Sequence, residues 1–133
     1  MRKLNNKGFT LVEIVIVIVI IAILAAMLVP ALTQWIDKSK LKTFTSACDT
    51  IRTAVWSAAA DQYAKDGTTT INNWTTVSCD VGKVVQSGNG ATDNDNTFNV
   101  TYNYNAGTMT VYNHTFHGSY DGNSWDCAKN TNS

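Results

Sequence analysis

Residues 9–32 read FTLVEIVIVIVIIAILAAMLVPAL, and this stretch decides what kind of protein the chain is. Every side chain from Ile14 to Val29 is apolar, and the part before it has two polar residues, Thr10 and Glu13. As an α-helix, this segment extends ~36 Å at ~1.5 Å per residue, enough to cross a hydrocarbon core of about 30 Å. The sequence therefore predicts a membrane-spanning helix.

The residues that flank the apolar stretch predict its orientation. Arg2, Lys3 and Lys7 precede it, and residues 1–8 contain no acid. Lys and Arg beside a first span resist translocation, so the N-terminus is expected in the cytoplasm and the bulk of the chain outside. A cleaved secretory signal fits less well, because its apolar region covers only ~7–15 residues and ends in an Ala-x-Ala pattern.

Glu13 is the only glutamate of the chain. A carboxylate in hydrocarbon costs on the order of a few kcal/mol, so it either finds a partner or stays near the interface. From charge alone two interpretations are open. Glu13 lies at headgroup depth and favours the helix N-terminus through the macrodipole, or it awaits a cation from another molecule.

Residues 7–13, KGFTLVE, lie behind a short basic leader and ahead of a long aliphatic run. This arrangement resembles the processing signal of type IV pilins and the related pseudopilins. The resemblance implies a leader at residues 1–8, cleavage between Gly8 and Phe9 by a prepilin peptidase, and N-methylation of Phe9. It also implies that Glu13 pairs with the N-terminal amine of a neighbouring subunit during filament assembly.

Pro30 interrupts the apolar stretch near its end. A proline inside a helix removes one backbone hydrogen bond and clashes with the carbonyl four residues back, that of Ala26, which predicts a kink or local melting. A simple bend at the membrane exit is the alternative. Members of the resembled family often carry a proline here, and the segment before it can lose helical order in assembled filaments.

Beyond the membrane the pattern becomes amphipathic. Apolar residues recur at spacings of three and four and end on Gln62, which predicts one buried helical face: Leu41, Phe44, Cys48, Ile51, Val55 and Ala58. Lys65-Asp66-Gly67 is a good helix stop. The predicted organisation is a leader at 1–8, a hydrophobic transmembrane or filament-core helix at 9–36, and an extracytoplasmic head at 37–133 whose amphipathic helix ends near 66.

After Gly67 the signals favour strands and loops. Residues 97–104 alternate, with Phe98, Val100, Tyr102 and Tyr104 on one side, and residues 108–116 are expected to return as a hairpin. Residues 77–86 are expected to add a further strand. The predicted class is α+β: one long N-terminal helix packed against a small antiparallel sheet, which is the pilin fold that the resemblance implies.

The chain has three cysteines in a region expected to be extracytoplasmic, where disulfides persist. Cys48 lies in the apolar stripe and is most simply a small buried hydrophobe. Spacing alone does not fix the connectivity. Many pilins carry a disulfide that encloses a C-terminal loop, so the resemblance favours a Cys79–Cys127 pair.

Residues 121–126, DGNSWD, are a candidate calcium loop, because Asp121, Asn123 and Asp126 offer the oxygens that this cation prefers. The loop lacks the distant bidentate Glu of a complete calcium signature, and Asp, Asn and Gly also make ordinary turns. Some major pseudopilins hold calcium in a late loop. No other cofactor is expected.

No spacing signal assembles a nucleophile, a base and an orienting group, so the chain is predicted to be a structural subunit rather than an enzyme. Ten basic and ten acidic residues give no sign of a specific nucleic-acid partner. The resemblance implies a membrane-stored monomer that polymerises into an extracellular type IV pilus on the cell surface, with the prepilin peptidase, assembly machinery and minor pilins as partners.

Two alternatives stay open at this stage. A pseudopilin of a type II secretion or competence DNA-uptake system would share all of the N-terminal chemistry. A single-span anchored binding domain that never polymerises would instead keep its leader.

Overall fold

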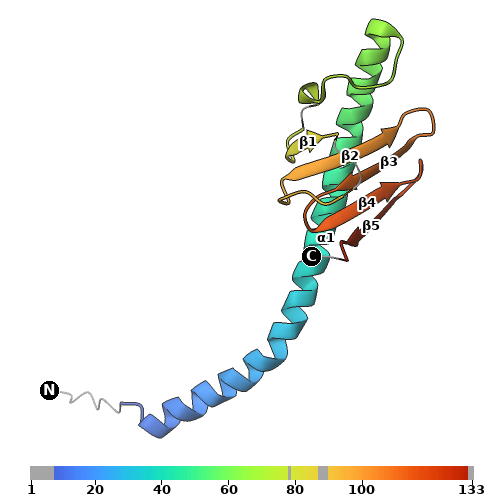
Figure 1. The fold of residues 1–133 in the computed structure, drawn as a ribbon. Coiled ribbons are helices and arrows are strands. Elements are labelled where there is room, and N and C mark those ends of the chain that lie inside the picture. Colours follow the sequence, from blue (N-terminus) through green and yellow to red (C-terminus); the bar gives the residue numbers. More distant parts are fainter. Residues whose placement is uncertain (1–7, 78, 87–89, 132–133) are drawn as a thin grey trace, which may run out of the picture. The chain divides into compact units, whose positions relative to one another are not determined.

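The computed structural model describes residues 8–77, 79–86 and 90–131, which belong to two compact units, Met1–Lys38 and Ser39–Ser133. Most of the predicted leader, residues 1–7, lies outside the described residues. One long helix runs through both units and is followed by a short 3₁₀ helix and a sheet (Figure 1). The elements are α1 (Leu11–Asp66), η1 (Trp74–Thr76), β1 (Lys83–Val85), β2 (Thr97–Asn103), β3 (Thr108–Tyr112), β4 (Phe116–Tyr120) and β5 (Trp125–Lys129).

The helix ends where its sequence predicts. Lys65 lies in its last turn, and Gly67 adopts a φ of 76°, which is the left-handed conformation of a helix stop. The N–H of Gly67 donates to the carbonyl of Tyr63 at 2.8 Å, and the Asp66 carboxylate accepts the N–H of Thr68 at 2.9 Å. These bonds satisfy backbone groups that the end of a helix leaves unpaired.

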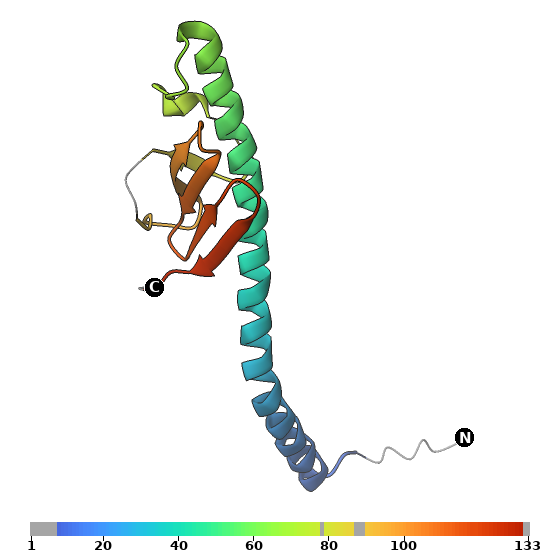
Figure 2. The same cartoon turned by 90° about the vertical axis from the view of Figure 1, so that its right-hand side faces the viewer.

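The sheet has five strands in the order β1-β2-β3-β4-β5. Neighbours from β2 to β5 run antiparallel, as expected, whereas β1 runs parallel to β2 with Val84 beside Phe98. The α+β expectation is therefore confirmed, with the correction that the sheet is mostly rather than wholly antiparallel. Figure 2 shows the strands on one side of the part of α1 that belongs to the second unit.

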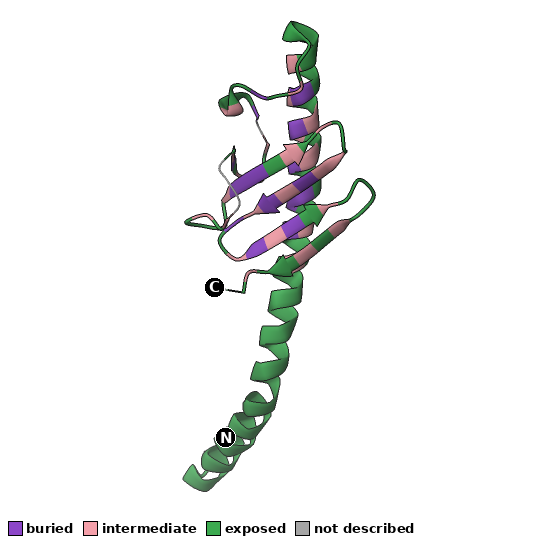
Figure 3. Cartoon of the chain, turned by 45° about the vertical axis from the view of Figure 1, so that its right-hand side comes forward, coloured by how far each residue is buried: buried purple, intermediate pink, exposed green. Residues whose placement is uncertain are grey.

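The core of the second unit lies between the sheet and this part of α1 (Figure 3). The helix contributes a stripe at helical spacing, which agrees closely with the predicted face: Phe44, Ala47, Cys48, Ile51, Val55 and Ala59. The strands contribute alternate residues that face the stripe: Val84, Phe98, Val100, Met109, Val111 and Phe116. Ile51, Val55, Val100 and Val111 are fully buried, so the centre of this core is aliphatic.

Two strand predictions were incomplete. The predicted return strand at 108–116 ends at Tyr112, because the Asn113 side chain accepts the N–H groups of Thr115 and Phe116 at 3.0 and 2.7 Å and turns the chain. Residues 125–129 form β5, where the sequence suggested only loop and tail. The predicted strand at 77–86 is limited to β1. Gly82 directly precedes β1, and a Cβ added at this glycine would clash with the Asn96 carbonyl.

Gly118 in β4 is the point of closest approach between the sheet and the helix stripe. A Cβ at this position would lie 3.0 Å from the Cys127 sulfur and 3.3 Å from both the Cys48 sulfur and the Phe44 ring. Its φ is not in the left-handed region, so the backbone does not require glycine here. Packing alone excludes a larger residue.

We therefore expect Gly118→Ala to destabilise the head by about 1–3 kcal/mol through overpacking. Urea unfolding of the full chain in detergent, followed by tryptophan fluorescence, measures the loss. Ser119→Ala is the matched control, because Ser119 is the exposed neighbour on the same strand and its substitution should change the midpoint little. Equal midpoints for the two variants would contradict this packing argument.

Candidate functional site

The N-terminal helix begins with a reciprocal capping box. The N–H of Thr10 donates to Oε2 of Glu13 at 2.8 Å, and the N–H of Glu13 donates to Oγ1 of Thr10 at 3.3 Å. The Thr10 hydroxyl also donates to the same Oε2 at 3.0 Å. Thr and Glu three residues apart satisfy backbone donors that the first helical turn leaves unpaired, so the side chains of this segment define where α1 starts.

The position of Glu13 agrees with the first interpretation of its charge, a carboxylate at the start of the helix, and the pairing with a cation of another molecule stays a prediction. Glu13 lies in the first turn of α1, where a negative charge is favoured by the helix macrodipole. The sequence analysis missed the role of Thr10, although the T-x-x-E pattern at 10–13 is a recognised capping signal. Among the described residues, both polar contacts of the carboxylate use Oε2, which leaves Oε1 available for a donor from another molecule.

Gly8 and Phe9 lie immediately before the helix and are exposed. A Cβ at Gly8 would meet nothing within 4 Å, and its φ is not left-handed. Nothing in the described part of the chain therefore requires glycine at this position. The Phe9 side chain is 84% exposed.

The apolar stretch that follows is exposed along its whole length in the first unit. Each residue from Gly8 to Lys38 is exposed, including large aliphatic side chains such as Leu11, Ile20 and Leu28. α1 contains a segment long and apolar enough to cross a membrane. A soluble protein rarely leaves an apolar surface of this extent uncovered, so this segment is built for contact with lipid or with other protein.

Pro30 lies inside α1, and the helix continues through it without a break. Proline has no N–H, so the carbonyl of Ala26 loses its usual helical donor. The Thr33 hydroxyl donates to the Pro30 carbonyl at 3.0 Å and satisfies one acceptor near this point. The local melting predicted for assembled filaments stays a prediction.

The structure does not bring Cys79 and Cys127 together. Cys79 precedes β1, where its thiol contacts the Gly82 carbonyl at 3.6 Å, whereas Cys127 belongs to β5. Because β1 and β5 are opposite edges of the sheet, the pair favoured by the resemblance is not made, and all three cysteines are free thiols. Cys48 is fully buried, as expected for its place in the stripe, and its neighbour is Cys127.

The candidate calcium loop is the turn between β4 and β5. Oδ1 of Asp121 accepts the N–H groups of Asn123 and Ser124, each at 2.8 Å, while Asp126 is already part of β5 and pairs with Ser119. These N–H groups hold the pKa of the Asp121 carboxyl below its usual value, so their stabilisation is lost only as the pH falls through that lowered pKa. Asp121 closes the turn, and calcium binding stays a prediction.

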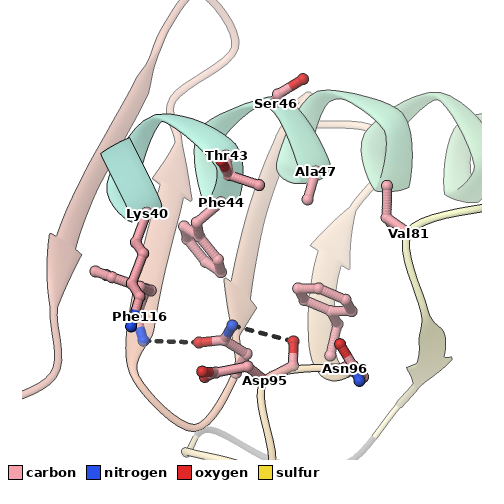
Figure 4. Close-up of a pocket in the computed structure, with 11 residues that line it drawn as sticks. Lys40, Thr43, Phe44, Ser46, Ala47, Val81, Asp95, Asn96 and Phe116 are labelled. Atoms are coloured by element: carbon pink, nitrogen blue, oxygen red, sulfur yellow. Dashed lines mark hydrogen bonds between the residues drawn. The ribbon is translucent and has the colours of Figure 1, made fainter. Parts of the chain in front are cut away.

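A cleft of about 570 Å³ opens at one end of the head core (Figure 4). Phe44, Phe98 and Phe116 line it, so its apolar wall is the rim of the core itself. Asn113 also lines the cleft. Its side-chain amide donates to the Asp95 carbonyl at 3.3 Å and accepts the N–H of Phe116, so it holds neighbouring backbone in place. Within the described residues, no group of three or more His, Cys, Asp or Glu side chains is placed to hold a metal.

Comparison with known proteins points to the same N-terminal segment. A family model described as the prokaryotic N-terminal methylation motif matches residues 3–29. Over 71 residues the chain is 35% identical to the type IV major fimbrial protein FimA of Dichelobacter nodosus. The match covers 53% of this chain and 44% of that protein, so the chain spans less than half of the length of this relative. No solved structure matches the chain significantly.

The methylation motif and the similarity to a type IV fimbrial protein both support the resemblance to type IV pilins, a family of structural subunits rather than enzymes. The matched motif coincides with the long apolar segment of α1.

The capping box gives a direct test of how α1 begins. Thr10→Ala should weaken the first helical turn by roughly 0.5–2 kcal/mol, because an N-cap side chain is lost, whereas Thr10→Ser keeps the hydroxyl. Amide hydrogen exchange of residues 11–14 in detergent micelles measures the effect, with faster exchange expected only in the alanine variant. Unchanged exchange in that variant would show that the box does not hold the helix start.

Proposed function

We propose that this chain is a pilin subunit: a precursor stored in the cytoplasmic membrane, cleaved after Gly8, N-methylated on Phe9, and polymerised through α1 into a type IV pilus. The observation that carries the proposal is the exposure of residues 11–32, a helical segment that is apolar apart from one carboxylate in its first turn. Membrane lipid covers this surface before assembly, and the same segment of other subunits covers it afterwards.

Processing explains why glycine precedes the helix. Since the described residues leave the space around Gly8 empty, the need for a small residue comes from an external binding partner, which we take to be the active site of a prepilin peptidase. Cleavage at this bond would remove residues 1–8, including the three basic residues that retain the N-terminus in the cytoplasm. The head, residues 37–133, lies on the outer side of the membrane in this scheme.

Assembly then depends on one charge pair. Cleavage creates an amine on Phe9, four residues before Glu13, and Oε1 of Glu13 is the acceptor left over by the capping box. A buried unpaired carboxylate is strongly unfavourable, while a paired one is tolerated, so the amine of a neighbouring subunit fixes one stagger between helices. The pair selects the register, and the aliphatic side chains, which are already out of water in the membrane, associate through packing of helix against helix.

The relative's name favours the pilus over the alternative of a pseudopilin. It is a major fimbrial protein, and pseudopilins of secretion or DNA-uptake systems share the N-terminal chemistry but build short filaments. Long surface fibres composed of this chain would support the first function. An anchored binding domain that never polymerises would keep residues 1–8. Assembly machinery and minor pilins are the further partners that a pilus requires.

Cleavage is tested by replacing Gly8. Gly8→Phe should leave the precursor uncut, because the peptidase no longer accommodates the residue before the cut, and at least tenfold less mature chain should be found by intact-mass spectrometry of membrane fractions. Gly8→Ala is the milder control, with partial processing expected. Efficient cutting of the phenylalanine variant at the same bond would contradict the role given to Gly8.

The charge of Glu13 is separable from its capping role. Glu13→Gln keeps an acceptor for Thr10 and so preserves the helix start, but it cannot pair with an amine as an anion. We expect normal cleavage and, since breaking a buried pair costs roughly 3–5 kcal/mol, a loss of sheared fibre of at least about tenfold. Glu13→Ala should lose both the cap and the pair. Wild-type fibre yield from the glutamine variant would mean that the charge does not direct assembly.

A further inference from the structure

The sulfur atoms of Cys48 and Cys127 both lie next to Gly118. A Cβ built on this glycine would lie 3.0 Å from Sγ of Cys127 and 3.3 Å from Sγ of Cys48, so both sulfur atoms flank a single point. Cys48 comes from α1, and Cys127 comes from β5, where it is the direct partner of Gly118 across the ladder. The residues are far apart in sequence, so only the fold brings them together.

The surroundings of the two thiols differ, which assigns them different roles in bond formation. Cys48 is fully buried in the core, whereas Cys127 is half-buried and open to an external reagent. Burial raises the pKa of the Cys48 thiol, and the neighbouring Cys127 raises it further. The side chain of Cys79, at the other edge of the sheet, faces the Gly82 carbonyl instead.

We propose that Cys48 and Cys127 form a disulfide that ties α1 to the last strand of the sheet. Gly118 makes room for this bond, which explains a glycine that the backbone conformation does not require. In the cell, the bond rests on the proposed function, because that function places the head in an extracytoplasmic compartment where disulfides persist.

The reaction is thiol–disulfide exchange with an external disulfide as oxidant, either a protein disulfide or oxidised glutathione. The more exposed Cys127 attacks first as a thiolate, which forms a mixed disulfide and releases one thiol of the oxidant. Cys48 then loses its proton and attacks Sγ of Cys127, which expels the second thiol. Two cysteine thiols are oxidised, one external disulfide is reduced to two thiols, and the Cys48 proton leaves on the second thiol.

The bond would secure one edge of the sheet. β5 is an edge strand in which only Trp125 and Cys127 are even half-buried. Apart from its ladder with β4, it is held to α1 by a hydrogen bond from Nε1 of Trp125 to Oδ1 of Asp49 at 3.0 Å. A cross-link between residues so distant in sequence constrains the unfolded chain strongly, and it prevents β5 from peeling away.

Peptide mapping tests the pairing directly. Trypsin separates the three cysteines onto different peptides, residues 43–52, 66–83 and 84–129, so each possible pair has its own mass. The purified full chain in detergent is equilibrated with oxidised and reduced glutathione, free thiols are alkylated, and the digest is analysed without reduction. We expect peptide 43–52 linked to 84–129, with Cys79 alkylated.

Variants and stability provide the controls. Cys79→Ser should keep the linked peptide, whereas Cys48→Ala and Cys127→Ala should each abolish it. A phosphine reductant should lower the Tm of wild type and Cys79→Ser by on the order of 10 °C, and it should leave the Tm of the two alanine variants unchanged.

A linked pair that contains residues 66–83, or full alkylation of all three cysteines after equilibration, would overturn the proposal. Because the oxidant is supplied in the test tube, this result does not depend on cleavage or polymerisation. Failure of fibre formation and failure of the disulfide are therefore distinguishable.

Discussion

The structure depends on one constraint: the aliphatic surface of residues 11–32 is exposed all round and has to be covered by something outside the chain. Full burial of each large aliphatic side chain contributes about 1.5–3 kcal/mol, so the segment as a whole strongly favours lipid or protein over water. Against that gain, the cost of one carboxylate, a few kcal/mol, is small. Glu13 therefore does not prevent burial, but it restricts burial to arrangements in which a cation reaches it.

The capping box holds the Glu13 carboxylate in a fixed position at the start of α1. Thr10 holds one oxygen of Glu13 and fixes the direction of the carboxylate at the start of α1. A side chain held in this way presents its other oxygen in one orientation, which suits recognition of a single partner better than a freely rotating carboxylate does. The head contributes little to this chemistry. It is a small sheet packed on a helical stripe, and its polar groups are largely used in turns, as the Asn113 and Asp121 side chains show.

Sequence patterns predicted the parts of the fold that depend on periodicity. The apolar run, the stripe from Phe44 to Val55 and the stop at Gly67 follow from helical spacing and turn chemistry, and the alternation from Phe98 to Tyr102 predicted β2. β5 was missed because a short, mostly exposed edge strand has no hydrophobic signal. The Cys48–Cys127 contact was missed because it depends on strand order, which brings β5 over the helix and places Cys79 at the opposite edge. At the N-terminus the residues of the site were found, but the bond between Thr10 and Glu13 was not.

A helical reconstruction of fibres purified from cells that produce this chain tests the central claim most directly. The account predicts that residues 11–36 of neighbouring subunits pack together along the fibre axis, and that Glu13 of one subunit lies within hydrogen-bond distance of the Phe9 amine of the next. Fibres whose subunits meet only through their heads, with residues 11–36 outside the contacts between subunits, would contradict it.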